Sequence, residues 1–125
     1  MNDNEIGDCL FECGLKVHRA LGPGLLESVY ETCLAHELAK LGLDVKRQLA
    51  LPVVYDGITM EGGYRIDLLI NGQVVVEVKS IERIAEIQRA QLLTYLRLGG
   101  YRLGYVLNFN VPLFKSGIAR VLNGY

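Results

Sequence analysis

Apolar side chains recur at the spacing of amphipathic helices in the N-terminal part of the chain. The first apolar stripe consists of Ile6, Cys9, Leu10, Cys13, Val17 and Leu21. The second stripe consists of Leu26, Tyr30, Leu34, Leu38 and Leu41. These stripes predict one helix over residues 3–20, with Asp3 or Asn4 as its N-cap, and another over residues 25–41. Gly22-Pro23-Gly24 separates the two helices, because neither residue type continues a helix well.

Two glycines lie inside the first predicted helix. Gly7 and Gly14 would each cost roughly 0.5–1 kcal/mol relative to alanine in a helix interior. Their presence indicates that another backbone approaches the helix closely at these positions.

Apolar, β-branched runs predict strands in the middle of the chain. Residues 45–55 are expected to form one strand, in which Pro52 marks an edge or a bulge. Asp56-Gly57 then turns the chain into residues 58–61. Two stronger apolar runs flank Asn71-Gly72, a dipeptide typical of hairpin turns, so a second hairpin is predicted there.

The pattern returns to helical spacing after residue 80. It predicts a helix over residues 84–98 that ends at Gly99-Gly100, and strands over residues 101–109 and 117–122. The order of elements is typical of an α/β (α+β) fold in which helices flank a mixed central sheet.

The length of the central turn decides which side chains share a face of the sheet. With a two-residue turn, Asp67 and Glu77 point to opposite faces and each face mixes charged with apolar residues. With a bulged loop formed by Ile70-Asn71-Gly72, in which Gly72 is left-handed, one face is almost wholly apolar. Its facing pairs are Leu68 with Val74, Ile66 with Val76, and Tyr64 with Val78. We therefore predict the bulged loop.

The opposite face of this hairpin then carries Asp67, Val75, Glu77 and Lys79. Glu77 and Lys79 lie about 7 Å apart on one strand, and Asp67 lies diagonally across on the next. A solvated face with an ordinary ion pair is one explanation. The apolar neighbours indicate instead an inner strand, where a charge is costly unless it binds something. Two carboxylates beside a lysine suit a hard cation such as Mg²⁺, a phosphate group and an attacking water.

At these residues the chain resembles the PD-(D/E)xK nuclease superfamily, with Asp67 as the motif aspartate and Glu77-Val78-Lys79 as the ExK element. Ile66 stands where the motif has proline. The segment Gly24-Leu25-Leu26-Glu27-Ser28-Val29-Tyr30 is similar to the signature of the GxxExxY protein family, whose members resemble this superfamily. The similarity spans nearly the whole chain, and it implies a restriction-endonuclease-like core and a metal-dependent nuclease.

The resemblance also implies roles for individual residues. Asp67 and Glu77 would bind Mg²⁺, with Mn²⁺ as the alternative, and Lys79 would position or charge the attacking water. Glu27 would be a third carboxylate, oriented by a hydrogen bond from Tyr30. Gln91 would touch the water or the substrate, with Tyr95 on the same stripe in support. Simple helix-terminus stabilisation also explains Glu27, and solvation also explains Gln91.

Length and net charge limit the number of domains and the kinds of partner that the sequence allows. The 125 residues, 50% of them hydrophobic, suggest a single domain over residues 1–125. The net charge of −1 provides no global attraction for DNA or RNA, so any contact with nucleic acid must be local. The sequence contains no signal peptide or membrane span, which predicts a cytoplasmic protein without a membrane partner. Small nucleases of this type often form homodimers, which the sequence leaves open.

Two other functions remain compatible with the sequence. One is a catalytically inactive nucleic-acid-binding module, although its carboxylates would repel phosphates unless a metal intervened. The other is a protein-interaction domain in which the charged residues form an internal ion-pair network, as small size and low net charge favour.

Overall fold

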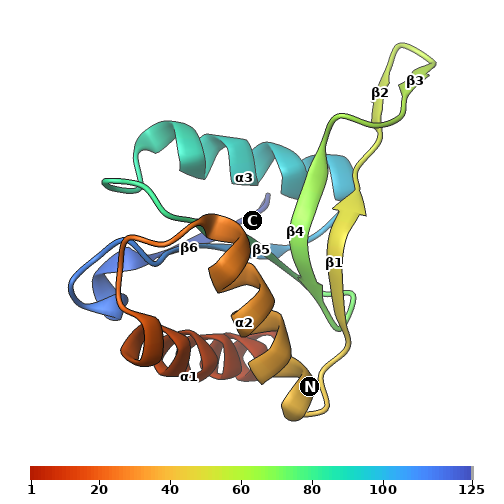
Figure 1. The fold of residues 1–125 in the computed structure, drawn as a ribbon. Coiled ribbons are helices and arrows are strands. Elements are labelled where there is room, and N and C mark those ends of the chain that lie inside the picture. The colour runs from red at the N-terminus through yellow and green to blue at the C-terminus, as the bar shows by residue number, and fades with distance from the viewer. Residues whose placement is uncertain (125) are drawn as a thin grey trace.

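A five-stranded mixed sheet lies between two layers of helices in the computed structural model, which describes residues 1–124 (Figure 1). The order across the sheet is β1 (Val45–Ala50), β4 (Arg65–Ile70), β5 (Val74–Lys79), β6 (Leu103–Asn108) and β7 (Ile118–Leu122). β5 and β6 are parallel, and the other neighbouring strands are antiparallel. This architecture confirms the predicted mixed sheet flanked by helices.

The helices cover the two faces of the sheet unequally. α1 (Asp3–Leu21) and α2 (Glu27–Lys40) pack on one face, and α3 (Glu86–Gly99), which connects β5 to β6, packs on the other. A short 3₁₀ helix, η1 (Phe114–Gly117), precedes β7. Within residues 1–124, no helix has the length and apolar content needed to cross a membrane.

Alternate residues of the central strands enter two separate apolar cores. Leu68, Val74 and Val76 pack against α1 and α2. Leu69 and Val75 pack with residues of α3 on the opposite side. Because β5 is covered on both faces, it is apolar at almost every position, and all of residues 74–78 are buried.

The N-terminus of α1 differs from the prediction. Asn2, not Asp3 or Asn4, is the N-cap: its Oδ1 accepts the Glu5 N–H at 2.8 Å, and Glu5 Oε1 accepts the Asn2 N–H at 2.9 Å. This reciprocal capping box requires a Glu or Gln side chain three residues after the cap, and Glu5 satisfies that spacing for Asn2.

The predicted stripe of α2 is correct only inside the helix. Tyr30, Leu34 and Leu38 are buried, as expected. Leu26 and Leu41 are 75% and 55% exposed, because they lie just outside the two ends of the helix and do not follow its apolar face.

Aromatic side chains, rather than another backbone, fill the space beside the two glycines of α1. A Cβ atom at Gly14 would collide with the ring of Phe114, and one at Gly7 would meet the hydroxyl of Tyr105. The close approach was therefore predicted correctly, but the expectation of a backbone partner is wrong.

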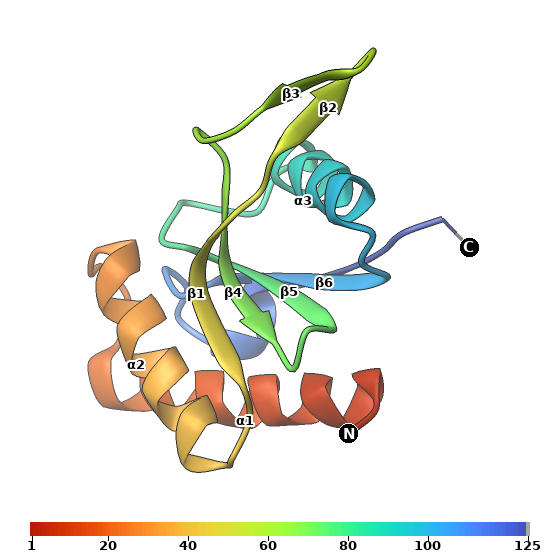
Figure 2. The same cartoon turned by 90° about the vertical axis from the view of Figure 1, so that its right-hand side faces the viewer.

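The predicted strand over residues 45–55 is in fact two strands. β1 ends at Ala50, and β2 (Val53–Tyr55) pairs only with β3 (Ile58–Met60) in a separate two-stranded sheet. The break falls at Leu51-Pro52, where proline cannot donate a ladder hydrogen bond. Asp56-Gly57 forms the predicted turn, with φ of 49° and 78°. The β2–β3 hairpin projects beyond the five-stranded sheet on the side of α3 (Figures 1 and 2).

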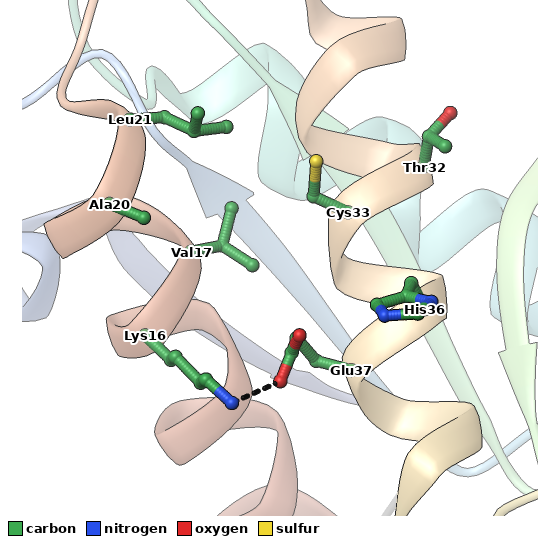
Figure 3. Close-up of a pocket in the computed structure, with 8 residues that line it drawn as sticks. All are labelled: Lys16, Val17, Ala20, Leu21, Thr32, Cys33, His36 and Glu37. Carbon is green, nitrogen blue, oxygen red and sulfur yellow. Dashed lines mark ion pairs between the residues drawn. The ribbon is translucent and has the colours of Figure 1, made fainter.

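A surface hollow of about 360 Å³ lies between α1 and α2 (Figure 3). Lys16 and Glu37 form an ion pair across it, with Nζ and Oε1 2.8 Å apart. This exposed pair contributes little to stability. None of the charged residues of the central hairpin lines the hollow, so it is separate from the candidate chemistry.

Candidate active site

A three-residue loop over residues 71–73 joins β4 to β5. The strands pair through Ile70↔Val74, Leu69↔Val75 and Leu68↔Val76. The three-residue loop and the left-handed Gly72, at φ 66°, confirm the prediction. The loop begins one residue later than predicted, so Leu68 faces Val76 rather than Val74. Asn71 accounts for this difference, because both its backbone N–H and its side-chain oxygen bond the backbone of Asp44 at 2.8 Å.

Near the loop, the side chains of β4 point to the predicted faces of the sheet. Farther from the loop, they do not. Leu68 enters the core beneath α1 and α2. Ile66 instead packs in the core beneath α3, and Tyr64 is half exposed. The β4–β5 ladder ends at Leu68↔Val76, so the outer part of β4 is free to twist away from β5.

Where the backbone ladder ends, the side chains of Asp67 and Glu77 form the hydrogen bonds between β4 and β5. The Asp67 N–H donates to Glu77 Oε2 at 3.0 Å, and the Val78 N–H donates to Asp67 Oδ2 at 2.8 Å. Continuing the observed register places Asp67 directly opposite Glu77, not diagonally as predicted. Each carboxylate is therefore held against the strand that carries the other.

Burial makes the ionisation of both carboxyls costly. Glu77 is 5% exposed, and its burial together with the Asp67 charge raises its pKa to about 8. Burial also raises the pKa of Asp67, against the hydrogen bond from the Val78 N–H. The Lys79 charge lowers both pKa values without cancelling these effects. At neutral pH the Glu77 carboxyl is therefore largely protonated, and a cation at this site would favour its ionisation.

Lys79 lies half-buried at the end of β5, beside Asn108 of β6. Its charge acts on both carboxyls, which places it near them. Within the described residues its ammonium forms no ion pair. The ammonium is thus available to a bound substrate.

Glu27 is the first residue of α2 and reaches the end of β5. Its Oε2 accepts the Ser80 N–H at 3.0 Å, and the Ser80 hydroxyl donates to the Leu25 carbonyl at 2.7 Å. Ser80 follows Lys79 directly, so these bonds fix the N-terminus of α2 beside the candidate site. Glu27 remains exposed and bonds neither Asp67 nor Glu77.

Tyr30 does not orient Glu27 through a hydrogen bond, and that expectation is wrong. The Tyr30 hydroxyl donates to the Gly22 carbonyl at 2.6 Å and accepts the Leu25 N–H at 3.0 Å. Its buried ring stacks on Phe109, with 4.6 Å between the centroids. Tyr30 therefore fixes the loop that leads into Glu27, rather than the carboxylate itself.

A polar network next to Asp67 was missed by the sequence analysis. Glu31, which is 6% exposed, accepts hydrogen bonds from Arg47 Nη2 at 3.0 Å and from Gln48 Nε2 at 2.7 Å. Gln48 Nε2 also donates to Asp67 Oδ1 at 3.2 Å. The available signal was a charged residue on the apolar stripe of α2, because Glu31 lies three residues before Leu34.

The backbone of Gln48 is unusual for a residue inside a strand. Its φ is 51°, and the ladder between β1 and β4 passes from Arg47↔Leu68 to Leu49↔Ile66 without it. A left-handed residue other than glycine costs on the order of 1–3 kcal/mol. The strain coincides with the point where the side chain links the Glu31 and Asp67 carboxylates.

Gln91 and Tyr95 line a groove of about 510 Å³ between the β2–β3 hairpin and α3. Tyr95 is buried, and burial followed by the Glu77 charge raises the pKa of its hydroxyl. It packs in the same apolar core as Ile66 and Val75, which precede Asp67 and Glu77 in their strands. Gln91 is exposed, and within the described part of the chain it makes no hydrogen bond to either carboxylate. Tyr64 meets Tyr95 edge to face, with centroids 6.2 Å apart.

The donor chemistry fits a hard divalent cation, although the ligand set is small. Across residues 1–124, no group of three or more His, Cys, Asp or Glu side chains is arranged to hold a metal. Asp67 and Glu77 supply carboxylate oxygens whose ionisation is unfavourable without a compensating charge. Mg²⁺ is commonly held by only one or two carboxylates, with waters and substrate phosphates completing its coordination.

Residues 4–121 match the family model described as the PD-(D/E)XK nuclease superfamily. The match spans α2 and both strands of the central hairpin. No curated protein and no solved structure matches the chain.

Proposed function

This chain belongs to the PD-(D/E)XK nuclease superfamily, and we propose that it is a nuclease that hydrolyses phosphodiester bonds of DNA or RNA with a divalent cation. The observation that carries the proposal is the reciprocal arrangement of Asp67 and Glu77, in which a half-buried and a buried carboxyl meet at the end of a strand ladder. Nucleases of this superfamily generally use divalent metals. Mg²⁺ is the proposed ion, with Mn²⁺ as the alternative.

Asp67 and Glu77 are the proposed metal ligands. The cation, when bound, supplies a Lewis acid that polarises the phosphate and activates water. Glu77 would bind it as the ionised carboxylate and give up the proton that burial retains. Glu27 is the proposed third carboxylate: Oε2 is held by Ser80, and within residues 1–124 its Oε1 makes no hydrogen bond.

Lys79 is the proposed catalytic residue for charge stabilisation. A protonated lysine has donors and no acceptor, so it acts on the attacking water or on a phosphate oxygen rather than on the cation. Hydrogen bonds from its ammonium would be strongest to the oxygen atoms on which negative charge develops during attack. Gln91 and Tyr95 are proposed to support the substrate from the neighbouring groove.

The test is cleavage of labelled single-stranded and double-stranded DNA and RNA with Mg²⁺, Mn²⁺ or a chelator. Lys79→Ala should lose on the order of 10² to 10³ in rate, because one preorganised donor is removed. Its metal affinity in calorimetry should be nearly unchanged, whereas Glu77→Gln should weaken both metal binding and cleavage. Lys115→Ala, which removes an exposed lysine of η1, is the matched control. Equal cleavage by Lys79→Ala and wild type would reject the role of Lys79.

A protein-interaction domain on the same fold is the second candidate. The buried Glu31, with its Arg47 ion pair and Gln48 hydrogen bond, is the kind of internal network that this alternative predicts. If wild type cleaves nothing in the panel and calorimetry detects no metal binding, this alternative replaces the nuclease. An inactive nucleic-acid-binding module would instead bind the oligonucleotides without cleaving them.

A further inference from the structure

The groove between the β2–β3 hairpin and α3 has the size and lining of a ligand site. Val53 and Met60 line it from the hairpin, and Ile87 and Leu98 line it from α3. Its volume of about 510 Å³ lies within the roughly 300–1,000 Å³ typical of small-molecule pockets. The apolar side chains are unusually accessible, with Ile87 69% exposed.

The lining excludes some occupants and favours others. Within residues 1–124, no Lys, Arg, His, Asp or Glu lines the groove, so a phosphate group there would find no cation. The lining does offer an aromatic ring, because Tyr64 is 50% exposed. Gln91 and Thr94 add an amide and a hydroxyl at the helix side. A flat, uncharged group with polar edges satisfies both features.

The groove lies close to the carboxylate site. Tyr95 lines the groove and packs in the same apolar core as Ile66 and Val75, which precede Asp67 and Glu77 in their strands. Tyr64, in edge-to-face contact with Tyr95, precedes Asp67 by three residues on the same segment. This spacing lets one nucleic-acid strand place a phosphate at the carboxylates and a neighbouring group against Tyr64.

We propose that this groove binds an unpaired nucleobase of the substrate strand, next to the phosphate that is cleaved. The proposal rests on the nuclease function above, and it assigns the substrate class as nucleic acid with unpaired nucleotides. A base inside a duplex has both faces stacked and cannot enter a side groove, whereas an unpaired base stacks on an exposed aromatic ring. Gln91 offers both donors and an acceptor, so it does not select one base.

Binding is measured separately from cleavage by fluorescence anisotropy of a labelled oligonucleotide with the Glu77→Gln variant in chelator. Chelator prevents metal-dependent hydrolysis, and glutamine keeps position 77 neutral at every pH used. The single strand should bind at least tenfold more tightly than its duplex. One abasic position along the strand should weaken binding more than the others.

In this background, Tyr64→Ala should lower affinity roughly 5- to 100-fold, as expected for loss of one stacked base, and Tyr64→Phe should retain it. Ile87→Glu, at a highly exposed position, should also weaken binding without disturbing the fold. Tyr55→Ala is the matched control, because Tyr55 is an exposed tyrosine of the β2–β3 hairpin that does not line the groove. Circular dichroism checks that each variant is folded.

Several results would overturn the proposal. These are equal affinity for single strand and duplex, a uniform abasic scan, an equal effect of Tyr55→Ala, or no oligonucleotide binding. Self-association that Tyr64→Ala abolishes, seen by sedimentation without oligonucleotide binding, would assign the groove to a second copy instead. If wild type cleaves but the abasic scan is uniform, base binding in the groove is rejected and the nuclease function is retained. A wild type that never cleaves but binds through Tyr64 rejects the nuclease and retains the base site.

Discussion

At the scale of residues, the burial of Glu77 determines the protonation state of the site, because its carboxyl is almost inaccessible to water. In water the charge of a glutamate is well solvated, but here burial disfavours it and the Asp67 charge disfavours it further. The hydrogen bond from the Asp67 N–H and the charge of Lys79 favour ionisation without outweighing these effects. The resting site therefore holds a proton that a bound cation would displace.

This proton predicts how stability depends on pH in chelator. Glu77 has a folded-state pKa of about 8 and an ordinary value of 4.5, so the folded state binds more protons between these values. Its contribution to stability is fully present below pH 4.5 and is lost as pH rises through about 8. The melting temperature should fall over this interval, and Glu77→Gln should flatten the curve. A wild-type curve that coincides with that of Glu77→Gln would show that the proton is not retained.

The hydrogen bonds of the Gln48 amide give a second prediction at the scale of residues. Gln48→Gly keeps the left-handed backbone without strain but removes the amide that donates to Glu31 and Asp67. The pKa of Asp67 should rise, because that hydrogen bond lowers it. Calorimetry across pH should therefore show the midpoint of metal binding at a higher pH than in wild type. An unchanged midpoint would make Gln48 a purely structural residue.

At the scale of elements, the site depends on how α2 and β5 are joined rather than on either alone. Glu27 and Ser80 are 53 residues apart in the chain, yet their hydrogen bond fixes the start of the helix to the end of the strand. Tyr30 holds the loop before the helix from the opposite side.

The contact between α1 and η1 gives a prediction about an element. Gly14→Ala places a Cβ against the ring of Phe114, which is buried and cannot move freely. The free energy of unfolding should fall by about 1–3 kcal/mol in urea, as for other overpacked cores. Gly7→Ala should cost less, because it meets only the terminal hydroxyl of Tyr105.

A double variant provides the control for this contact. Phe114→Leu in the Gly14→Ala background should recover part of the lost stability, because the smaller side chain makes room for the added methyl group. Additive losses in the double variant would show that the two positions are not coupled.

At the scale of the whole molecule, helices cover both faces of the sheet and Glu77 is buried in it, while the β2–β3 hairpin projects outside the sheet. The protein has a net charge of only −1, so its field does not attract a polyanion. Binding of nucleic acid would instead depend on the cation, on Lys79 and on the groove. Formation of a homodimer stays a prediction.

The carboxyl pair predicts that divalent metal stabilises the whole fold. A cation that binds only the native state should raise the melting temperature. At a free cation concentration one hundred times the dissociation constant, it should add about 2.7 kcal/mol to the free energy of unfolding. Asp67→Asn should abolish most of this shift, because it removes one of the two proposed carboxylate ligands. Asp44→Asn, at an exposed aspartate, is the matched control. Equal melting in millimolar Mg²⁺ and in chelator would contradict a metal site.

The sequence by itself determined the elements and the face that carries the charges. Hydrophobic periodicity is local, so the helices, the Asp56-Gly57 turn and the three-residue loop near Gly72 could be predicted. It also indicated that the charged residues of β5 lie on an inner strand, because the charges interrupt an apolar run. Asp67 and Glu77 do meet, as that pattern predicted.

Only the tertiary structure decided how these elements meet. The hydrogen bonds of Asn71 to Asp44 fix the loop one residue later and bring Asp67 opposite Glu77. The Glu31 network and the groove beside Tyr64 also join segments that are distant in the chain. Such contacts depend on the packing of several elements at once, and local periodicity carries no information about which distant side chains that packing will bring together.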